Sequence, residues 1–359
     1  MRFERLEISY FRNLSNVVVE LGPGLNYFFG DNGAGKTAML EATHLLCRSR
    51  SFRTKSARSL IQRDADMLVV RALAVDELRG PLTLAMSKDR QARTVLKVDG
   101  ERERRLSEAA RLTPLQVMLP DIAELVFGQP GLRRHWLDWG TFHVKPEYLV
   151  TLREYLRILR QRNAALKSAS PLPPWTAKLL VAAEAVTELR RQFLADLAPH
   201  FQQAIAALAP ELQVSLHFQQ GWPQLESLQK LLGDSAAREV KLGATQWGPH
   251  RADVELRLGA TRASTLLSRG QGKMVASALK ISQAAMLAQQ TQRATVFLID
   301  DVGAELDTGH SGRFFALLQD LGCQILATST QPPTAELAKV VKKLHRFHVE
   351  RGEVRVVGG

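Results

Sequence analysis

The sequence predicts an α/β protein whose strand-rich body is interrupted by a helical arm. Three observations support this fold class. A glycine-rich loop lies between an apolar strand and a helix, two long runs of helical periodicity fill the middle of the chain, and strand-like segments return afterwards. With 359 residues, the chain can hold two domains or one domain with a large insertion. We expect 1–120 and 243–359 to form the body and 121–242 to form the arm.

Short strands open the chain. The segment "RLEISYF" alternates apolar and polar residues, and "NVVVEL" is a β-branched run that ends at a Gly-Pro-Gly turn. The apolar "LNYFF" leads into the glycine loop, and apolar residues recur at helical spacing after Lys36. Further strands are expected in 65–100, where "MLVVRALAV", "PLTLAM" and "TVLKVDG" follow one another.

Two amphipathic helices make up the predicted arm. The first carries one apolar stripe, formed by Tyr148, Leu149, Leu152, Tyr155, Leu156 and Leu159. The segment "SASPLPPW" ends this helix, because three prolines cannot continue it. A second long periodic run follows, and packing of the arm's own core explains both stripes. The segments "ADVELRL" and "ATVFLIDD" then predict a return to strands.

The composition points to a basic protein of the cytoplasm. Lys and Arg total 48 against 36 Asp and Glu, which gives a net charge of +12. Such a charge favours a polyanionic partner, most often nucleic acid, although a generally basic proteome would produce the same charge. Cys47 and Cys323 lie far apart without metal-ligand spacing, which indicates a reducing compartment. The charged N-terminus does not look like a signal peptide, and no apolar run reaches the ~18 residues of a membrane span.

The glycine loop "GDNGAGKT" fits G-x-x-x-x-G-K-[ST] at each fixed position. Glycines in such a loop let backbone N–H groups turn toward phosphates, which the positive end of the following helix also attracts. Lys36 would bring its charge to the β- and γ-phosphates of ATP, and Thr37 would offer a hydroxyl to Mg²⁺. The expected nucleotide-binding residues are Gly30, Asp31, Asn32, Gly33, Ala34, Gly35, Lys36 and Thr37.

Two acidic residues end the apolar strand "TVFLIDD". We expect Asp300 to hold Mg²⁺, directly or through water, and Asp301 to orient or deprotonate the attacking water. Lys36, Asp300 and Asp301 are therefore the predicted catalytic residues, and Thr37 and Asp300 the predicted metal ligands. A strand that ends in two solvated acids is the simpler alternative.

The segment "LSRGQGK" precedes a long helix rich in Ala and Leu. Ser268, Gly270 and Gln271 form a Ser-x-Gly-Gln pattern, which in isolation would be explained as a helix N-cap. Its place between the phosphate loop and the acidic strand, with "GAELD" following, is typical of ABC-type ATPases. In that class the Ser-x-Gly-Gln segment contacts the γ-phosphate bound by a second subunit. The fold predicted is thus an ABC/RecA-like P-loop ATPase head with an inserted α-helical arm subdomain.

The chain resembles the RecF family from end to end. The segments "YFRNL", "RSFRTKSARSLI", "LPDIAELVFGQPGLRRHWLDW", "WGPHRADVEL", "LSRGQGK" and "LIDDVGAELD" follow the family's order. The resemblance implies that Arg12 and Asn13 reach the nucleotide. It also implies a DNA repair and replication protein whose ATP-dependent, head-to-tail homodimer binds duplex DNA near single-strand gaps. Weak, DNA-dependent ATP hydrolysis, recombinase loading with RecO- and RecR-type mediators, and a part in the SOS response are further implications.

Two other functions stay open. A transporter ATPase subunit would carry a switch histidine and a shorter interval between Lys36 and Asp300, and neither is found. An ATP-gated DNA-binding protein with vestigial hydrolysis would keep the same two residues, so the sequence separates it poorly from an ATPase.

The motifs also depart from the ABC pattern. Arg269 stands where these proteins often carry glycine, and Gly272 stands where a larger polar residue is expected. The segment "ILATSTQPP" has no histidine, so that Thr328, Ser329 or Thr330 would replace the switch histidine. A hydroxyl cannot take up a proton as imidazole does, and we therefore expect slow hydrolysis. Gln116 is a candidate for the glutamine that ABC proteins place beside the metal.

Basic residues without acidic neighbours predict the DNA contacts. Residues 42–63 contain no Asp or Glu, and the expected DNA-binding residues there are Arg48, Arg50, Arg53, Lys55 and Arg58. A second set on the first arm helix, Arg153, Arg157, Arg160 and Arg162, is an alternative, and so is a solvated basic surface. Because no base-reading motif is found, binding should depend on phosphate contacts and on salt.

Overall fold

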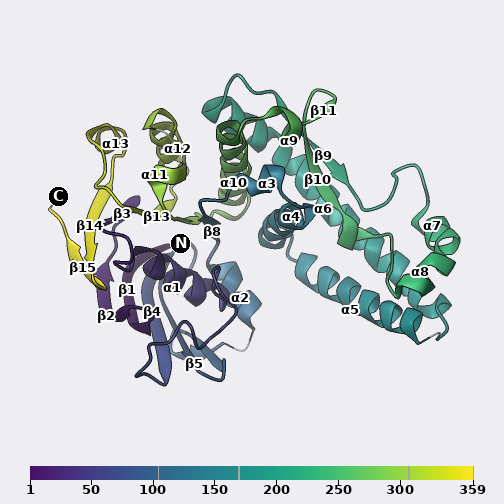
Figure 1. The fold of residues 1–359 in the computed structure, drawn as a ribbon, viewed down its shortest axis with the longest axis horizontal. Coiled ribbons are helices and arrows are strands. Elements are labelled where there is room, and N and C mark those ends of the chain that lie inside the picture. Colours follow the sequence, from purple (N-terminus) through teal and green to yellow (C-terminus); the bar gives the residue numbers. More distant parts are fainter. Residues whose placement is uncertain (104, 169, 306–307, 359) are drawn as a thin grey trace. The chain divides into compact units, whose positions relative to one another are not determined.

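The computed structural model describes residues 1–103, 105–168, 170–305 and 308–358 and divides the chain into two compact units (Figure 1). Unit 1 consists of Met1–Ile122 and Leu287–Gly359, and unit 2 of Ala123–Met286. The expected ranges put 243–286 with the C-terminal part of the body. In the structure these residues pack within unit 2, because a strand and a helix formed there join the sheet and helices of the arm.

A mostly parallel sheet forms one layer of unit 1, in the order β15-β14-β3-β13-β12-β8. Only β15 at its edge runs antiparallel. The residues of β12 and β13 are buried without exception, which is expected of parallel strands covered on both faces. The strand bounds are β3 Leu25–Phe29, β8 Leu115–Met118, β12 Val296–Ile299, β13 Gln324–Ser329, β14 Leu344–Glu350 and β15 Glu353–Val356.

An antiparallel sheet forms the second layer of unit 1, in the order β2-β1-β4-β5-β6-β7. Alternate residues of β4 are buried, as the period of a strand with one covered face requires. The strands expected in 1–29 and 65–100 are confirmed. The bounds are β1 Arg2–Phe11, β2 Leu14–Glu20, β4 Met67–Asp76, β5 Gly80–Asp89, β6 Thr94–Val98 and β7 Glu101–Arg102.

Helix α1, Lys36–Arg48, lies between the two sheets of unit 1. It contacts β1, β4 and β5 of the antiparallel sheet and β12 and β13 of the parallel sheet. Nearly all of its side chains are therefore buried, and they form one hydrophobic core with both layers. The other helices of this unit are α2 Leu106–Leu112, α11 Val302–Glu305, α12 Thr308–Asp320 and α13 Ala335–Val340.

Unit 2 is built on a long helical hairpin. Helices α5, Tyr148–Lys167, and α6, Pro173–Leu208, pack against each other, and the proline segment separates them as expected. Tyr148, Tyr155 and Leu159 of the predicted stripe are buried in the core of this unit. The remaining elements are α3 Glu124–Phe127, α4 Pro130–Val144, β9 Val214–Gln219, α7 Leu228–Asp234, α8 Ala236–Leu242, the 3-10 turn Pro249–Arg251, β10 Asp253–Leu258, β11 Thr261–Arg262, α9 Ala263–Leu266 and α10 Arg269–Thr291.

The described part of the chain contains no helix with both the length and the apolar character that a bilayer crossing needs. The segment "GAELD" was expected to follow the acidic strand. Leu306 and Asp307, its last two residues, lie outside the described residues.

Candidate nucleotide-binding site

The glycine loop connects β3 to α1 and leaves no room for side chains at two positions. Gly30 has φ 148°, and a Cβ there would lie 2.1 Å from the carbonyl oxygen of Val349. Gly35 has φ 118°, and a Cβ there would lie 2.8 Å from the side chain of Leu14. Both φ values belong to the region that glycine adopts without strain. The two glycines therefore allow the loop to curl closely before α1 begins.

Lys36 folds its side chain back over this loop. Its Nζ donates to the carbonyl oxygens of Gly30 at 2.7 Å and of Asp31 at 2.8 Å. Burial lowers the pKa of the Lys36 ammonium, while the charges of Asp301, Asp300 and Asp31 act in the opposite direction. The positive charge is thus held at the centre of the loop, where an anion would be bound.

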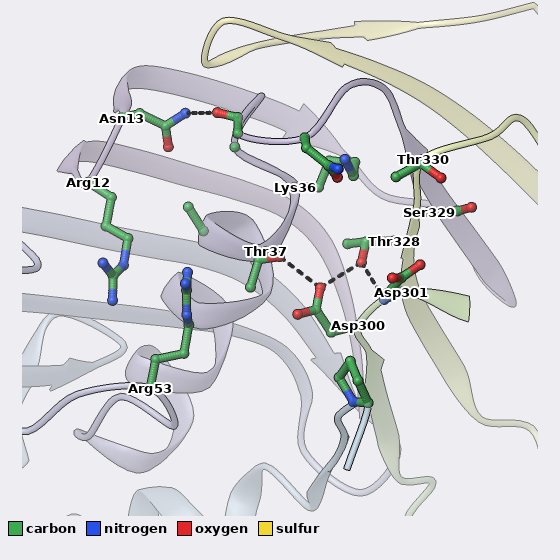
Figure 2. Close-up of a pocket in the computed structure, with 15 residues that line it drawn as sticks. Arg12, Asn13, Lys36, Thr37, Arg53, Asp300, Asp301, Thr328, Ser329 and Thr330 are labelled. Atoms are coloured by element: carbon green, nitrogen blue, oxygen red, sulfur yellow. Dashed lines mark hydrogen bonds between the residues drawn. The ribbon is translucent and has the colours of Figure 1, made fainter. Parts of the chain in front are cut away.

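Asp300 lies where β12 ends, and two hydroxyl groups hold its carboxylate. Its Oδ1 accepts from Thr37 Oγ1 at 2.8 Å and from Thr328 Oγ1 at 2.7 Å (Figure 2). The backbone N–H of Asp301 in turn donates to Thr328 Oγ1 at 2.9 Å. The three hydroxyl- and carboxylate-bearing residues come from the ends of α1, β12 and β13, so the parallel sheet brings them together at one edge.

A cavity of about 320 Å³ opens above these groups. Most of the predicted nucleotide and metal residues line it: Arg12, Asn13, Asn32, Gly33, Gly35, Lys36, Thr37, Asp300 and Asp301. Figure 2 shows that Thr328, Ser329 and Thr330 form the opposite wall. The volume lies at the lower end of the range for small-molecule sites. The glycine loop and the acidic strand end therefore meet at one pocket within unit 1, whereas Ser268, Gly270 and Gln271 do not line it.

Arg12 and Asn13 support the loop from the turn between β1 and β2. Asn13 Nδ2 donates to the carbonyl oxygen of Gly33 at 3.0 Å. Arg12 makes a bidentate pair with Glu41 of α1, in which Nη2 and Oε1 are 2.8 Å apart. The Glu41 side chain is fully buried, whereas that of Arg12 is 23% exposed. Ser51 also donates to this carboxylate.

Glu41 was missed by sequence reasoning. A carboxylate on the buried side of an apolar helix would have been the available signal, since such a group needs a cationic partner. Arg53, predicted as a DNA contact, also lines the nucleotide cavity. Gln116, the candidate metal-side glutamine, is buried within β8 and does not line the cavity, whereas Pro120 just beyond that strand does.

The Ser-x-Gly-Gln segment begins α10 in unit 2 and forms a reciprocal cap. The backbone N–H of Gln271 donates to Ser268 Oγ at 3.2 Å, and that of Ser268 donates to Gln271 Oε1 at 3.0 Å. This is the arrangement of a capping box. Ser268 and Gly270 are nonetheless exposed, at the end of the helix where the first N–H groups have no partner within the helix.

Two departures from the ABC pattern are explained by a contact with α3. A Cβ at Gly272 would lie 2.2 Å from the ring of Phe127, which excludes any larger residue there. Arg269 lies over the same ring, 5.5 Å from its centroid, and pairs with Glu124 at 2.8 Å. The unusual arginine and glycine therefore belong to one packed arrangement around Phe127.

The basic segment after α1 is largely exposed. Arg50, Arg53, Lys55 and Arg58 all lie at the surface of unit 1. Arg48 departs from the prediction, because its guanidinium turns inward and donates to the carbonyl oxygen of Leu115 at 3.0 Å. Burial lowers its pKa to about 10.

The alternative basic set on α5 contains both exposed and buried arginines. Arg153, Arg157 and Arg160 are exposed. Arg162 is buried, donates to Glu239 Oε2 at 2.7 Å and to Thr245 Oγ1 at 2.8 Å, and thus belongs to the core of unit 2. An arginine held in this way cannot reach DNA, and the expectation for Arg162 is wrong.

The whole chain has relatives of known family. The model of the RecF/RecN/SMC N-terminal domain matches residues 2–353. A DNA replication and repair protein RecF from Shewanella loihica is 35% identical over 99% of this chain and 100% of its own length. The chain belongs to the RecF family. A RecF protein from Pseudomonas entomophila is likewise 35% identical, over 99% of this chain and 98% of its own.

Solved structures share the fold along the same length. The recombination mediator protein RecF with ATP, described as part of the RecFOR pathway, has a TM-score of 0.86 and 24% identity, and the match covers 99% of this chain and 97% of that one. An SMC head bound to the C-terminal winged-helix domain of ScpA has a TM-score of 0.63 and 16% identity, with 99% and 97% covered. The predicted ABC-type ATPase fold is therefore confirmed, and a transporter subunit is not favoured.

Proposed function

We propose that this protein binds and hydrolyses ATP to control its hold on DNA during recombinational repair. The observation that carries the proposal is the convergence of Lys36, Thr37, Asp300 and Asp301 on one cavity beside a glycine loop. Relatives over the full length are named for DNA replication and repair, which supports the same process here.

The side chains of the cavity suit a triphosphate. Lys36 holds the only ammonium among the described residues that line it, and its charge would stabilise the β- and γ-phosphates. The oxygens of Thr37 and Asp300 are the donor types that Mg²⁺ prefers, and they are already adjacent. When bound there, Mg²⁺ would neutralise charge on the transferred phosphate.

Asp301 is the residue proposed to orient the attacking water. It follows Asp300 directly, lines the same cavity, and has φ 56°, so its backbone is held in an uncommon conformation. Hydroxyl groups of Thr328, Ser329 and Thr330 occupy the wall where related ATPases use a histidine. Because these hydroxyls do not gain a proton, turnover should be slow, and ATP would serve as a timer of binding.

The second half of the site would come from another copy of the chain. Exposed Ser268 and Gly270 at the start of α10 offer a hydroxyl and free N–H groups at the positive end of a long helix. In a head-to-tail homodimer, each such segment would close over the ATP held by its partner. The dimer would then form with ATP and dissociate after hydrolysis.

Duplex DNA near single-strand gaps is the proposed substrate of this dimer. Arg50, Lys55 and Arg58 supply exposed positive charge for phosphate contacts. By family membership, RecO- and RecR-type mediators are proposed as partners in recombinase loading and in the SOS response. Two buried, unpaired thiols, Cys47 and Cys323, agree with the proposed cytoplasmic location.

The mass of the protein in solution, measured with and without ATP, tests the proposal. Wild type should shift from monomer to dimer when ATP is added. Lys36→Arg should lose the shift by weakening ATP binding, and Ser268→Arg should lose it while still binding ATP. If ATP leaves the wild-type mass unchanged, the dimer switch is rejected. The exposed Lys339→Arg of α13 serves as the control.

A further inference from the structure

Unit 2 contains a second, larger cavity that the ATP cycle does not use. Its volume is about 840 Å³, and its walls come from β9 with the turn after it, from α8, and from the loop before β10. Three aromatic side chains line it, those of Phe218, Trp222 and Trp247. The described residues around it include no Asp or Glu. An aromatic and basic cavity of this size is a candidate ligand site.

The two tryptophans are held in place by a tight crossing of glycines. The N–H of Gly248 donates to the carbonyl oxygen of Gly221 at 3.3 Å, and a Cβ at Gly221 would lie 2.1 Å from the Gly248 oxygen. Trp222 and Trp247 are the neighbours of these glycines in sequence. Both indoles pack partly on the core of unit 2 and partly line the cavity. Packing of this kind limits the freedom of the rings and lowers the cost of ordering them when a ligand binds.

His250 holds the loop before β10 in place through two hydrogen bonds. Its Nδ1 accepts from the hydroxyl of Tyr155 at 2.6 Å, and its Nε2–H donates to the carbonyl oxygen of Thr245 at 3.1 Å. The family-like segment "WGPHR" therefore builds a preorganised wall of the cavity.

Arginines supply uncompensated charge beside the aromatic rings. Arg238 and Arg251 are exposed, and in the described part of the chain neither pairs with a carboxylate. Within the described residues, Arg251 donates to the neutral amide oxygen of Gln246 at 3.1 Å. Arg257 differs, because it pairs with Glu255. Two free positive charges and flat aromatic faces are the combination that binds single-stranded nucleic acid, through phosphate attraction and base stacking.

We infer that this cavity is a binding site for single-stranded nucleic acid, with bases stacked on Trp222 and Trp247 and phosphates held by Arg238 and Arg251. The site requires no ATP and no dimer. This site would contact the unpaired strand of a gap directly, in addition to the proposed duplex binding. The inference remains valid even if the proposed ATP-dependent dimer is rejected.

Binding of a fluorescent oligothymidylate of about 12 nucleotides, measured by anisotropy without ATP, tests the inference. Wild type should bind and its tryptophan fluorescence should be quenched. Arg238→Glu should weaken binding about ten-fold, whereas Lys339→Glu, an equal charge change at an exposed site outside the cavity, should have little effect. Trp222→Leu should also weaken binding about ten-fold, and Trp222→Phe should retain most of it because a stacking face remains.

Duplex binding and ATP turnover separate this site from the proposed function. Arg238→Glu should leave both unchanged, since the residue lies outside the nucleotide cavity. Equal oligothymidylate affinity for wild type and Arg238→Glu would overturn the inference. An acidic peptide such as oligoglutamate that quenches the tryptophans while oligothymidylate does not would overturn it as well.

Discussion

Thr328 Oγ1 donates a hydrogen bond to Asp300 Oδ1 at 2.7 Å and connects the ends of two neighbouring parallel strands. Thr328 Oγ1 also accepts a hydrogen bond from the backbone N–H of Asp301. One hydroxyl therefore orients the proposed metal ligand and fixes the backbone of the residue that would orient water. This relationship places Thr328 among the groups that prepare the site, rather than only on its wall.

Replacement of Thr328 by valine should reduce ATP turnover about ten-fold or more, because Asp300 loses a fixed donor while the shape of the side chain is kept. Thr328→Ser should retain most of the activity, since its hydroxyl can still bridge. ATP affinity should change little in either variant. Turnover by a phosphate-release assay and binding by calorimetry check this, and wild-type turnover in Thr328→Val would contradict it.

Gly272→Ala should destabilise the protein despite the higher helix propensity of alanine. The added Cβ would meet the Phe127 ring at 2.2 Å, and a clash of this kind typically costs about 1–3 kcal/mol, against about 1 kcal/mol gained from propensity. In a Phe127→Ala background the same change should become neutral or stabilising. Urea unfolding of wild type, the two single variants and the double variant forms a double-mutant cycle. Additive effects would show that the Phe127 ring is not the reason why glycine is required at position 272.

Arg12→Ala should destabilise the protein more than Glu41→Gln does. The first change leaves a fully buried carboxylate without its cation, at about 3 kcal/mol. The second leaves a partly exposed guanidinium that water can reach, at about 1 kcal/mol. Arg5→Ala, which breaks pairs with Glu7 and Glu20 whose side chains all remain more than a third exposed, is the control and should cost less than about 1 kcal/mol. The reverse order of Arg12 and Glu41 would show that the pair is not buried in solution.

Local sequence patterns predicted the fold because each motif carries its own structural requirement. The glycine loop specifies a strand before it and a helix after it, and an apolar run ending in Asp300 and Asp301 specifies a buried strand. The parallel sheet then brings these ends together. The order of the motifs along the chain therefore suffices to predict that the glycine loop and the acidic residues lie at one cavity.

Side-chain partners could not be predicted in the same way, since they depend on contacts between distant segments. Arg162 looked like one of four basic residues on a helix, yet it meets Glu239, which lies 77 residues later. Arg48 looked like its exposed neighbours but ends α1 and faces a carbonyl of β8. Charge pattern reports the presence of a cation, whereas burial is decided by the tertiary fold.

The basic segment after α1 and the basic residues of α5 lead to opposite predictions for duplex binding. Arg58→Ala should weaken binding at all sequences and lower the salt slope by about 1, as expected when one phosphate contact is lost. Arg160→Ala, an equal change on α5, should leave the slope unchanged. Duplex affinity measured with ATP over a series of salt concentrations distinguishes them. An effect confined to Arg160→Ala would move the duplex contact to the arm.

Stability should fall as the solution is acidified, and His250 should account for part of this. Burial first, and then the charges of Arg251, Arg134 and Arg190, lower its pKa from 6.5 to about 4, although its bond to Thr245 opposes the shift. The unfolded chain therefore binds this proton more readily than the folded chain, so the stabilisation is complete above about pH 6.5 and is lost as the pH falls toward about 4.

His44 in unit 1 has a similarly lowered pKa of about 4 and should add to the pH slope of the wild-type protein. His250→Asn can keep an acceptor for Tyr155 and a donor for Thr245 without titrating. Its free energy of unfolding should therefore fall less steeply between about pH 7 and about pH 5 than that of wild type, whatever its absolute stability. Urea unfolding of both proteins across this range measures the two slopes. Equal slopes would mean that His250 has the same pKa in the folded protein as in the unfolded chain. The loop beside Trp247 would then be more open to water than its hydrogen bonds indicate.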